Sequence, residues 1–379
     1  MSILKSIQRR SRRAALVAGA LALYLGAAAP AGAHIVPVHD MARGINMTPA
    51  QCASLPMTVW VTASGRAFCI RYYLSNAGGR SVTPLVFLQG DRLGKLNLKT
   101  GEWAPSDKEK DIDTDDLLKV ADSMSKQAKT TAIYLGRVGV EGSSGDHRIR
   151  HTVLELNVTH AALEAIKRRY RFEGFHFVGQ SGGSKLVGGL LALRDDIGCA
   201  VIGAGRLNSG KAKPAQDPGM SYFNVADAIP TIIAKHSGRI ILVTDPQDKK
   251  VPEKTQTSFV QMMRQAGGRV EQYLVEATDE NRHGVLAYAR LAASDCIRGA
   301  SPQEIGRNVQ ALVQKRVADA RAKANTQASG QPNVRPNSAP AAAGHALPYR
   351  SPAATVSQPP VRLPPQAPIG ARRIGPTAS

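Results

Sequence analysis

The stretch FHFVGQSGGSKL, residues 175–186, joins a predicted strand directly to a predicted helix. Residues 175–178 form a short apolar run rich in aromatic and branched side chains, which is typical of a buried strand. Residues 186–193 are rich in Leu, Gly and Ala and predict a closely packed helix. The segment between them has the pattern Gly-x-Ser-x-Gly and predicts a sharp strand-to-helix turn at Ser181.

A turn of this kind exposes the serine hydroxyl above the edge of the sheet. The flanking positions Gly179 and Gly183 are glycines because a Cβ there would collide with the neighbouring strand and helix. The backbone N–H of Gly182 lies at the start of the following helix, where it is suited to stabilising an oxyanion. The stretch therefore predicts a nucleophile elbow rather than a glycine-rich turn without chemistry.

Strand-like and helix-like segments alternate through residues 34–320, which predicts a mostly parallel, twisted α/β sheet with helices on both faces. The predicted strands are residues 59–63, 67–74, 85–88, 131–135, 175–178, 200–204, 239–243 and 270–275. The predicted helices are residues 114–128, 154–170, 186–193, 224–236, 255–266, 285–293 and 303–321. Residues 206–222 are irregular and are the best candidate for a segment over the mouth of a site.

A serine nucleophile needs a base, and the base needs a carboxylate that fixes its tautomer. Two aspartates, Asp245 and Asp248, follow the strand at 239–243, and His283-Gly284 follows the last strand. The order Ser, Asp, His along the chain fits a hydrolase built on such a sheet. Asp279 and Glu280 are nearer to His283 in sequence, but they lie on its own loop and are expected to be solvated.

Three motifs together resemble the α/β-hydrolase superfamily: the elbow at Ser181, the Asp-x-x-Val-Pro at Asp248 and the His-Gly at His283. Within it they are most similar to the catalytic domain of the prolyl oligopeptidase family and to dienelactone-hydrolase-like esterases. The resemblance covers roughly residues 68–298. It implies an α/β-hydrolase fold in which Ser181 is the nucleophile, His283 the general base and Asp248 the orienting carboxylate, with Asp245 as the competing acid.

The loop after the predicted strand at 85–88 is expected to supply a second oxyanion donor besides Gly182. Related enzymes usually have His-Gly in this loop, whereas this chain has Gln89-Gly90-Asp91. Since a backbone N–H makes the hydrogen bond, the change of side chain is tolerable, and the donor is either Gly90 or Asp91. Arg137 with Gly139 resembles a structural turn of these hydrolases and is expected to form a buried ion pair.

The net charge of +20 is distributed unevenly. Five positive charges fall in residues 1–33 and seven in residues 320–379, and neither segment contains an acidic residue. A nucleic-acid-binding protein would carry its charge on the folded domain beside aromatic residues, which make up only 5% of this chain. No nucleic-acid partner is therefore expected, although the basic tail suits weak contact with an anionic cell envelope.

The two ends differ from the body of the chain. Residues 1–33 have a basic start, an apolar stretch and an Ala-Gly-Ala cleavage site, which predicts a signal peptide and a periplasmic or secreted protein. Arg12-Arg13 allows the twin-arginine route of export. Residues 321–379 are rich in Ala, Pro, Gln and Arg and are predicted to be a disordered tail, because they bury too little apolar surface to offset ordering.

Four cysteines, an even number, fit two disulfides in an exported protein. Three pairings are possible, and Cys52–Cys69 with Cys199–Cys296 is favoured because the first two are close in sequence. None of the cysteines has metal-site spacing. His147 and His151 lack the glutamate of a metalloprotease motif, and neither a P-loop nor a dinucleotide-binding pattern is complete, so neither metal nor cofactor is expected.

The sequence thus predicts an exported serine hydrolase that cleaves an amide or ester in a small-molecule or peptide substrate. The family resemblance favours a peptidase, and a carboxylesterase is the alternative. A non-catalytic envelope-binding protein that retains the fold is the rival of a different class. The oligomeric state is left open.

Overall fold

A computed structural model of the chain describes residues 46–92, 95–96, 103–104, 113–210 and 217–329. The predicted signal peptide, residues 1–33, and most of the predicted tail, residues 330–379, lie outside the described residues. Within the described part, no helix combines the length and the apolar character that crossing a membrane requires.

An eight-stranded sheet forms the centre of the described domain, in the order β1-β2-β6-β3-β7-β8-β9-β10. Its strands are β1 (Thr58–Ala63), β2 (Arg66–Ser75), β3 (Leu85–Leu88), β6 (Ala132–Leu135), β7 (Phe175–Gln180), β8 (Ile197–Gly203), β9 (Arg239–Thr244) and β10 (Glu271–Leu274). Six neighbouring strands run parallel, namely β6, β3, β7, β8, β9 and β10. Strand β2 is antiparallel to both β1 and β6. The carboxyl ends of β7, β8, β9 and β10 therefore meet at one edge of the sheet.

The central strands are apolar at nearly every position because both faces of the sheet are covered. In β3, Val86 and Leu88 belong to one hydrophobic core, and Leu85 and Phe87 belong to the other. All four side chains are at most 1% exposed. The continuous apolar runs in the sequence are thus two interleaved sets of core residues, one for each face.

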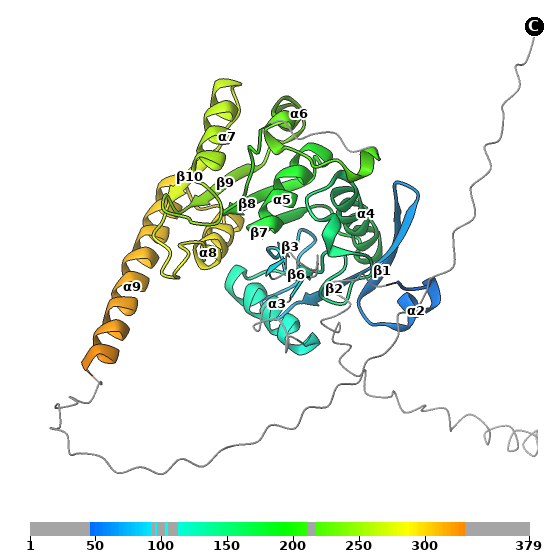
Figure 1. Cartoon of the computed structure of the whole chain (residues 1–379), viewed down its shortest axis with the longest axis horizontal. Coiled ribbons are helices and arrows are strands. Elements are labelled where there is room, and N and C mark those ends of the chain that lie inside the picture. Colours follow the sequence, from blue (N-terminus) through cyan, green and yellow to red (C-terminus); the bar gives the residue numbers. More distant parts are fainter. Residues whose placement is uncertain (1–45, 93–94, 97–102, 105–112, 211–216, 330–379) are drawn as a thin grey trace, which may run out of the picture. The chain divides into compact units, whose positions relative to one another are not determined.

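Two layers of helices enclose the sheet (Figure 1). The first core contains residues of α4 (Val153–Tyr170), α5 (Gly182–Leu193), α6 (Ile229–Lys235) and α7 (Lys254–Gln265). The second core contains residues of α3 (Thr114–Ala128), α8 (Leu286–Ile297) and α9 (Pro302–Ser329). The short helices are α2 (Pro49–Ser54), η2 (His147–Ile149), η3 (Pro218–Met220) and η4 (Val225–Ala228).

Helix boundaries follow from capping residues that are visible in the sequence. The Asp113 side chain accepts a hydrogen bond from the Asp116 backbone N–H and begins α3, and Lys129 ends it in the left-handed conformation. Thr152 caps α4 in the same way through the N–H of Glu155. Pro230 lies in the first turn of α6, where a proline is tolerated, so it starts this helix instead of interrupting it.

The strand order and the mostly parallel pairing are those of the α/β-hydrolase fold, as predicted from the sequence. The sheet has helices on both faces, and each strand predicted from the sequence is present. Helix α2 and the antiparallel pair β4 (Lys95–Leu96) and β5 (Trp103–Ala104) were not predicted from the sequence, because each is too short to give a periodic pattern.

The predicted start of the disordered tail at residue 321 is wrong, because α9 continues to Ser329. Ile305, Val309 and Val313 anchor the first half of this helix in the second core, with a spacing of four residues. Residues 321–325 are exposed. They are mostly Ala, Arg and Lys, strong helix formers that extend an anchored helix without needing a core of their own.

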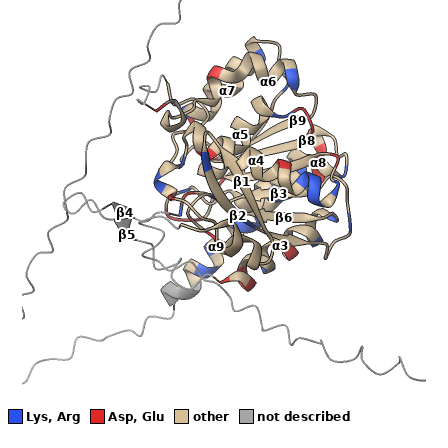
Figure 2. Ribbon diagram, turned by 90° about the vertical axis from the view of Figure 1, so that its right-hand side faces the viewer, with Lys and Arg blue, Asp and Glu red and all other residues tan. Residues whose placement is uncertain are grey.

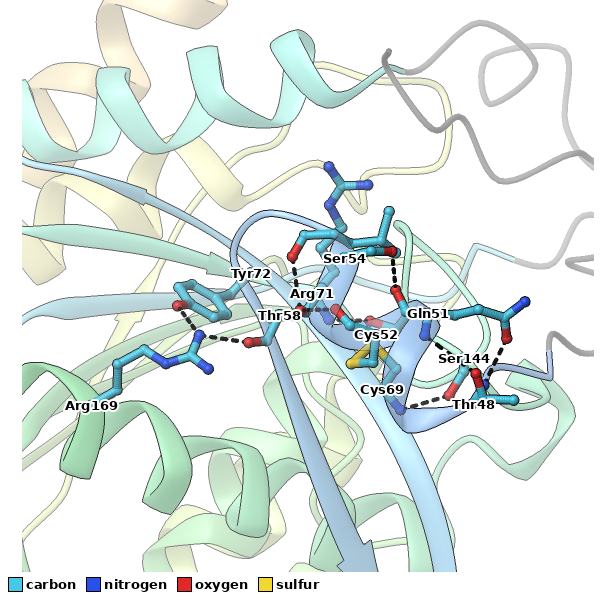
Figure 3. Close-up of a disulfide and its surroundings, with 12 residues drawn as sticks. Thr48, Gln51, Cys52, Ser54, Thr58, Cys69, Arg71, Tyr72, Ser144 and Arg169 are labelled. Atoms are coloured by element: carbon cyan, nitrogen blue, oxygen red, sulfur yellow. Dashed lines mark hydrogen bonds between the residues drawn. A yellow bond between two sulfur atoms is a disulfide. The ribbon is translucent and has the colours of Figure 1, made fainter. Parts of the chain in front are cut away.

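Two disulfides tie the domain together, with the pairing favoured from the sequence. Cys52–Cys69 joins α2 to β2, and Cys199–Cys296 joins β8 to α8. Figure 3 shows the first of these beside Ser144, whose hydroxyl accepts a hydrogen bond from the Cys69 N–H at 2.7 Å. Because Ser144 belongs to the glycine-rich turn after β6, this contact fixes that turn against β2.

Replacing Cys199 and Cys296 together with alanine is expected to lower the free energy of unfolding by about 2–5 kcal/mol. The bridge spans 97 residues and restricts the unfolded chain strongly. The matched control replaces Cys52 and Cys69, which are only 17 residues apart and should cost less. Urea-induced unfolding under non-reducing conditions measures both. This explanation would be contradicted if removing the long bridge lowered the free energy of unfolding by no more than removing the short one.

Candidate active site

Ser181 lies between β7 and α5 in a strained backbone conformation, with φ of 53° and ψ of −117°. A non-glycine residue in such a region costs about 1–3 kcal/mol and is held there by its surroundings. The Ser181 N–H donates to the carbonyl of Gly203 on β8 at 2.8 Å, and the Ser184 hydroxyl donates to the same oxygen. The elbow residue and the first turn of α5 are therefore both fastened to one carbonyl of the neighbouring strand.

The flanking glycines leave no room for side chains. A Cβ at Gly179 would lie 2.6 Å from the Ser184 Cα, and one at Gly183 would lie 2.0 Å from the Leu88 carbonyl oxygen. Both contacts are with backbone atoms, which cannot move aside cheaply. This close approach of strand, turn and helix is the reason for glycine that the sequence analysis anticipated.

Asp248 and His283 come together from loops that follow β9 and β10. The Asp248 Oδ2 lies 2.7 Å from the His283 Nδ1, while Oδ1 accepts the N–H groups of Lys250 and Val251 at 2.7 and 2.9 Å. The Asp248 side chain is fully buried. Because a carboxylate only accepts hydrogen bonds, His283 carries its proton on Nδ1 and its Nε2 is the basic nitrogen.

The histidine loop is also attached directly to the elbow strand. The Gln180 Nε2 donates to the carbonyl of His283 at 2.8 Å, and Gln180 immediately precedes Ser181. The exposed carboxylate of Asp279 accepts the N–H groups of His283 and Gly284 at 3.2 and 2.7 Å. Asp279 thus shapes the backbone of the loop, while Asp248 orients the imidazole ring.

Asp245, the competing acid, has other partners. Its buried carboxylate accepts the Ala277 N–H at 2.7 Å, the Gln247 N–H at 2.8 Å and the Arg282 Nε–H at 2.8 Å. These bonds join the loop after β9 to the loop that carries the histidine. Asp245 therefore holds the two loops together and makes no bond with the imidazole of His283.

The loop after β3 lies against the elbow. A Cβ at Gly90 would come within 3.1 Å of the Ser181 Cβ and 3.8 Å of its Oγ, so the Gly90 backbone is next to the serine. The Asp91 carboxylate is 2.8 Å from the Arg137 Nη1, 2.8 Å from the His151 Nε2 and 3.3 Å from the Arg150 Nε. Although burial opposes its charge, Arg137 and His151 hold the pKa of Asp91 well below its usual range.

Arg137 forms the buried ion pair that the sequence analysis anticipated. Its guanidinium is completely buried, pairs with the equally buried Glu155 of α4 at 2.9 Å, and donates to the Gln89 carbonyl at 3.2 Å. The link from Arg137 to Asp91 was not foreseen from the sequence. It joins the turn after β6, helix α4 and the loop after β3 at one point.

The two histidines weighed as metal ligands have separate structural contacts. The ring of His147 is buried, and its Nδ1 lies 2.9 Å from the Val138 carbonyl oxygen. Burial and the nearby Arg137 lower the pKa of His147 to about 3. His151 bonds Asp91 instead. Among the described residues, no group of three or more His, Cys, Asp or Glu side chains is arranged to hold a metal ion.

A cavity of about 640 Å³ opens beside the serine. Its lining consists of Asp91, His151, Ser181, Gly182, Lys185, Arg206, Ser209, Tyr222, Lys250 and Val251. The irregular segment 206–222 contributes three of these residues, in agreement with its predicted place beside the site. Lys185 was not predicted as a site residue, although a position four residues after Ser181 at the start of the same helix places it on the same side.

Comparisons with known proteins give structural likenesses only. No family model matches the chain, and no curated protein matches it. An esterase of Pyrococcus furiosus is 12% identical, with 67% of this chain and 96% of that chain covered and a TM-score of 0.45. Est1E of Butyrivibrio proteoclasticus, solved with ferulic acid bound, is 14% identical, with 64% and 98% covered and a TM-score of 0.43.

An acylaminoacyl peptidase of Pyrococcus horikoshii is 13% identical, with a TM-score of 0.41. The match covers 68% of this chain but only 40% of the peptidase. At such identities the likenesses concern the fold alone, and the fold is established here by the strand order and the mostly parallel pairing. On that basis the chain is a protein with the α/β-hydrolase fold.

Proposed function

We propose that the protein is an exported serine hydrolase that cleaves an ester or amide bond through an acyl-enzyme. The observation that carries this proposal is the 2.7 Å contact between the buried Asp248 and the His283 Nδ1. Both residues follow parallel strands whose carboxyl ends share an edge with the strained turn at Ser181. A nucleophile, a base and an orienting carboxylate at one sheet edge are the groups that acyl transfer requires.

In this mechanism the Ser181 Oγ attacks the substrate carbonyl while the His283 Nε2 takes the hydroxyl proton. The negative charge on the tetrahedral oxygen is stabilised by the Gly182 N–H at the start of α5 and by an N–H of the Gly90–Asp91 segment. The imidazolium then protonates the leaving group, which departs and leaves Ser181 acylated. Water, deprotonated by His283, releases the acyl group and restores the serine.

Export is supported by the predicted signal peptide at residues 1–33 and by the two disulfides, since disulfides persist in oxidising compartments. The same catalytic groups serve peptides and esters, and the sequence motifs favour a peptide. A carboxylesterase is the alternative within the proposal. A non-catalytic binding protein would need neither a strained serine nor a histidine oriented by a buried carboxylate.

A fluorophosphonate probe is expected to label the mature protein at one site per molecule. Labelling should be lost in Ser181→Ala, which removes the nucleophile, and in His283→Ala, which removes its base. Mass spectrometry of the labelled protein measures this, and circular dichroism verifies that both variants are folded. Absence of labelling in folded wild-type protein would refute the hydrolase proposal and favour the non-catalytic binding protein.

Asp248→Asn is expected to lower kcat on the order of 10³- to 10⁴-fold, because an amide cannot hold the imidazole in its productive tautomer. Asp245→Asn serves as the matched control. It weakens the bonds to Arg282 and Ala277, so it should lower the melting temperature while its folded form keeps a kcat within about 10-fold of wild type. Steady-state kinetics and thermal unfolding of both variants decide between the two acids, and a reversed pattern would make Asp245 the orienting carboxylate.

A further inference from the structure

Basic side chains outnumber acidic ones among the described residues that line the cavity beside Ser181. Of the described residues that line it, Lys185, Arg206 and Lys250 are basic, and Asp91 is the one that is acidic. The Asp91 carboxylate is already bonded to Arg137, Arg150 and His151. Among the described residues of the wall, Asp91 thus has ion-pair partners of its own, and Lys185, Arg206 and Lys250 have no carboxylate within ion-pair distance.

Lys185 is the least favourably placed of these cations. It lies on the elbow helix α5, one turn after Ser181, and is only 5% exposed. Its ammonium group is 4.9 Å from the centre of the Phe223 ring. Among the described residues no carboxylate lies within ion-pair distance of it. Burial, assisted by Arg206, lowers the pKa of Lys185 to about 8, so the side chain is still mostly charged at neutral pH.

Two further effects oppose a cation at this position. A buried charge with no carboxylate at ion-pair distance is costly, and the Phe223 ring and the more distant charges of Asp91 and Glu155 offset only part of that cost. The positive end of a helix dipole also disfavours a cation in the first turn. A lysine that served only packing would be replaced without loss by an uncharged side chain of similar length. A bound anion would relieve both effects, and the first turn of α5 would attract the same anion.

The other two cations lie at the rim of the same cavity. Arg206 follows β8 and Lys250 lies in the loop between β9 and α7, and the Arg206 Nη2 is 3.4 Å from the Lys250 carbonyl oxygen. Both residues are exposed, and neither has a carboxylate of the described residues within ion-pair distance. Along the ribbon in the view of Figure 2, basic and acidic residues are interspersed. The described lining of the cavity, by contrast, carries three basic residues and one acidic residue besides His151.

We infer that this cavity binds substrates that carry a carboxylate close to the scissile bond, with Lys185 as the buried anchor and Arg206 and Lys250 at the rim. The inference rests on the proposed function, because it assigns a substrate class to the same site. Within an ester or amide, the carboxylate belongs to the acyl part, as in a half-ester of a dicarboxylic acid, or to the leaving group. The shared chemistry is an anion held beside the reacting carbonyl.

Two pairs of probes distinguish these sources. The acyl pair is the 4-nitrophenyl ester of glutaric acid and the same ester with its free carboxylate methylated. The leaving-group pair is the butyrate ester of 4-hydroxybenzoic acid and that of methyl 4-hydroxybenzoate. The readout is the ratio of kcat/KM for the anionic probe to kcat/KM for its neutral partner. We expect this ratio to exceed about 10 in one pair, as a charge-assisted contact allows.

Lys185→Met keeps the length of the side chain and removes its charge. It is expected to reduce the ratio about 10- to 100-fold. A general loss of folding or of nucleophilicity lowers both members of a pair and leaves the ratio unchanged. The matched control is Lys119→Met on α3, whose side chain is 73% exposed on the opposite helix layer and should preserve the ratio.

Direct binding separates this inference from the proposed function. Calorimetric titration of the Ser181→Ala variant with glutarate and with 4-hydroxybenzoate should show binding. The double variant that also carries Lys185→Met should not bind either anion. Fluorophosphonate labelling of wild type together with ratios near one and no binding of either anion would overturn the inference while leaving the hydrolase proposal standing. Binding that depends on Lys185 in a protein that is not labelled would support the anion site and overturn the proposed chemistry.

Discussion

The buried guanidinium of Arg137 is the point at which the parts of the site are joined. Its charge is balanced by Glu155 on α4 and by Asp91 in the loop after β3, and the guanidinium also donates to the Gln89 carbonyl. Removing one member of such a cluster would leave an uncompensated charge in the interior. This would destabilise the fold by more than the intact ion pair stabilises it. The position of the β3 loop beside Ser181 depends on this cluster.

The same constraint explains how an aspartate is tolerated next to a predicted oxyanion site. The Asp91 Oδ1 lies so close to the Gly182 α-carbon that a Cβ there would come within 2.1 Å of it. Its charge is nevertheless directed into bonds with Arg137, Arg150 and His151. The other charged side chains among the described residues of the cavity wall are the basic Lys185, Arg206 and Lys250.

Asp245 and Asp248 show how two similar carboxylates acquire different tasks. Both are buried and both follow β9, three residues apart. Asp245 is bonded to the backbone and to Arg282 of the next loop, whereas Asp248 contacts the imidazole of His283. One carboxylate joins the two loops and the other contacts the ring, because the partners within hydrogen-bond distance of each are different.

The sequence by itself determined the elements whose cause is local: apolar runs for the buried strands, capping residues for α3 and α4, and glycines around Ser181. The sequence also predicted Ser181, Asp248 and His283 as site residues, because each lies in a motif that follows a predicted strand. The carboxyl ends of parallel strands share one edge, so such residues lie near one another. Only the tertiary structure showed that Asp245 bonds Arg282 instead of His283, that Asp91 pairs with Arg137, and that Lys185 has no carboxylate partner among the described residues. These contacts join residues from different loops, and their distances depend on how the loops pack, which no local pattern records.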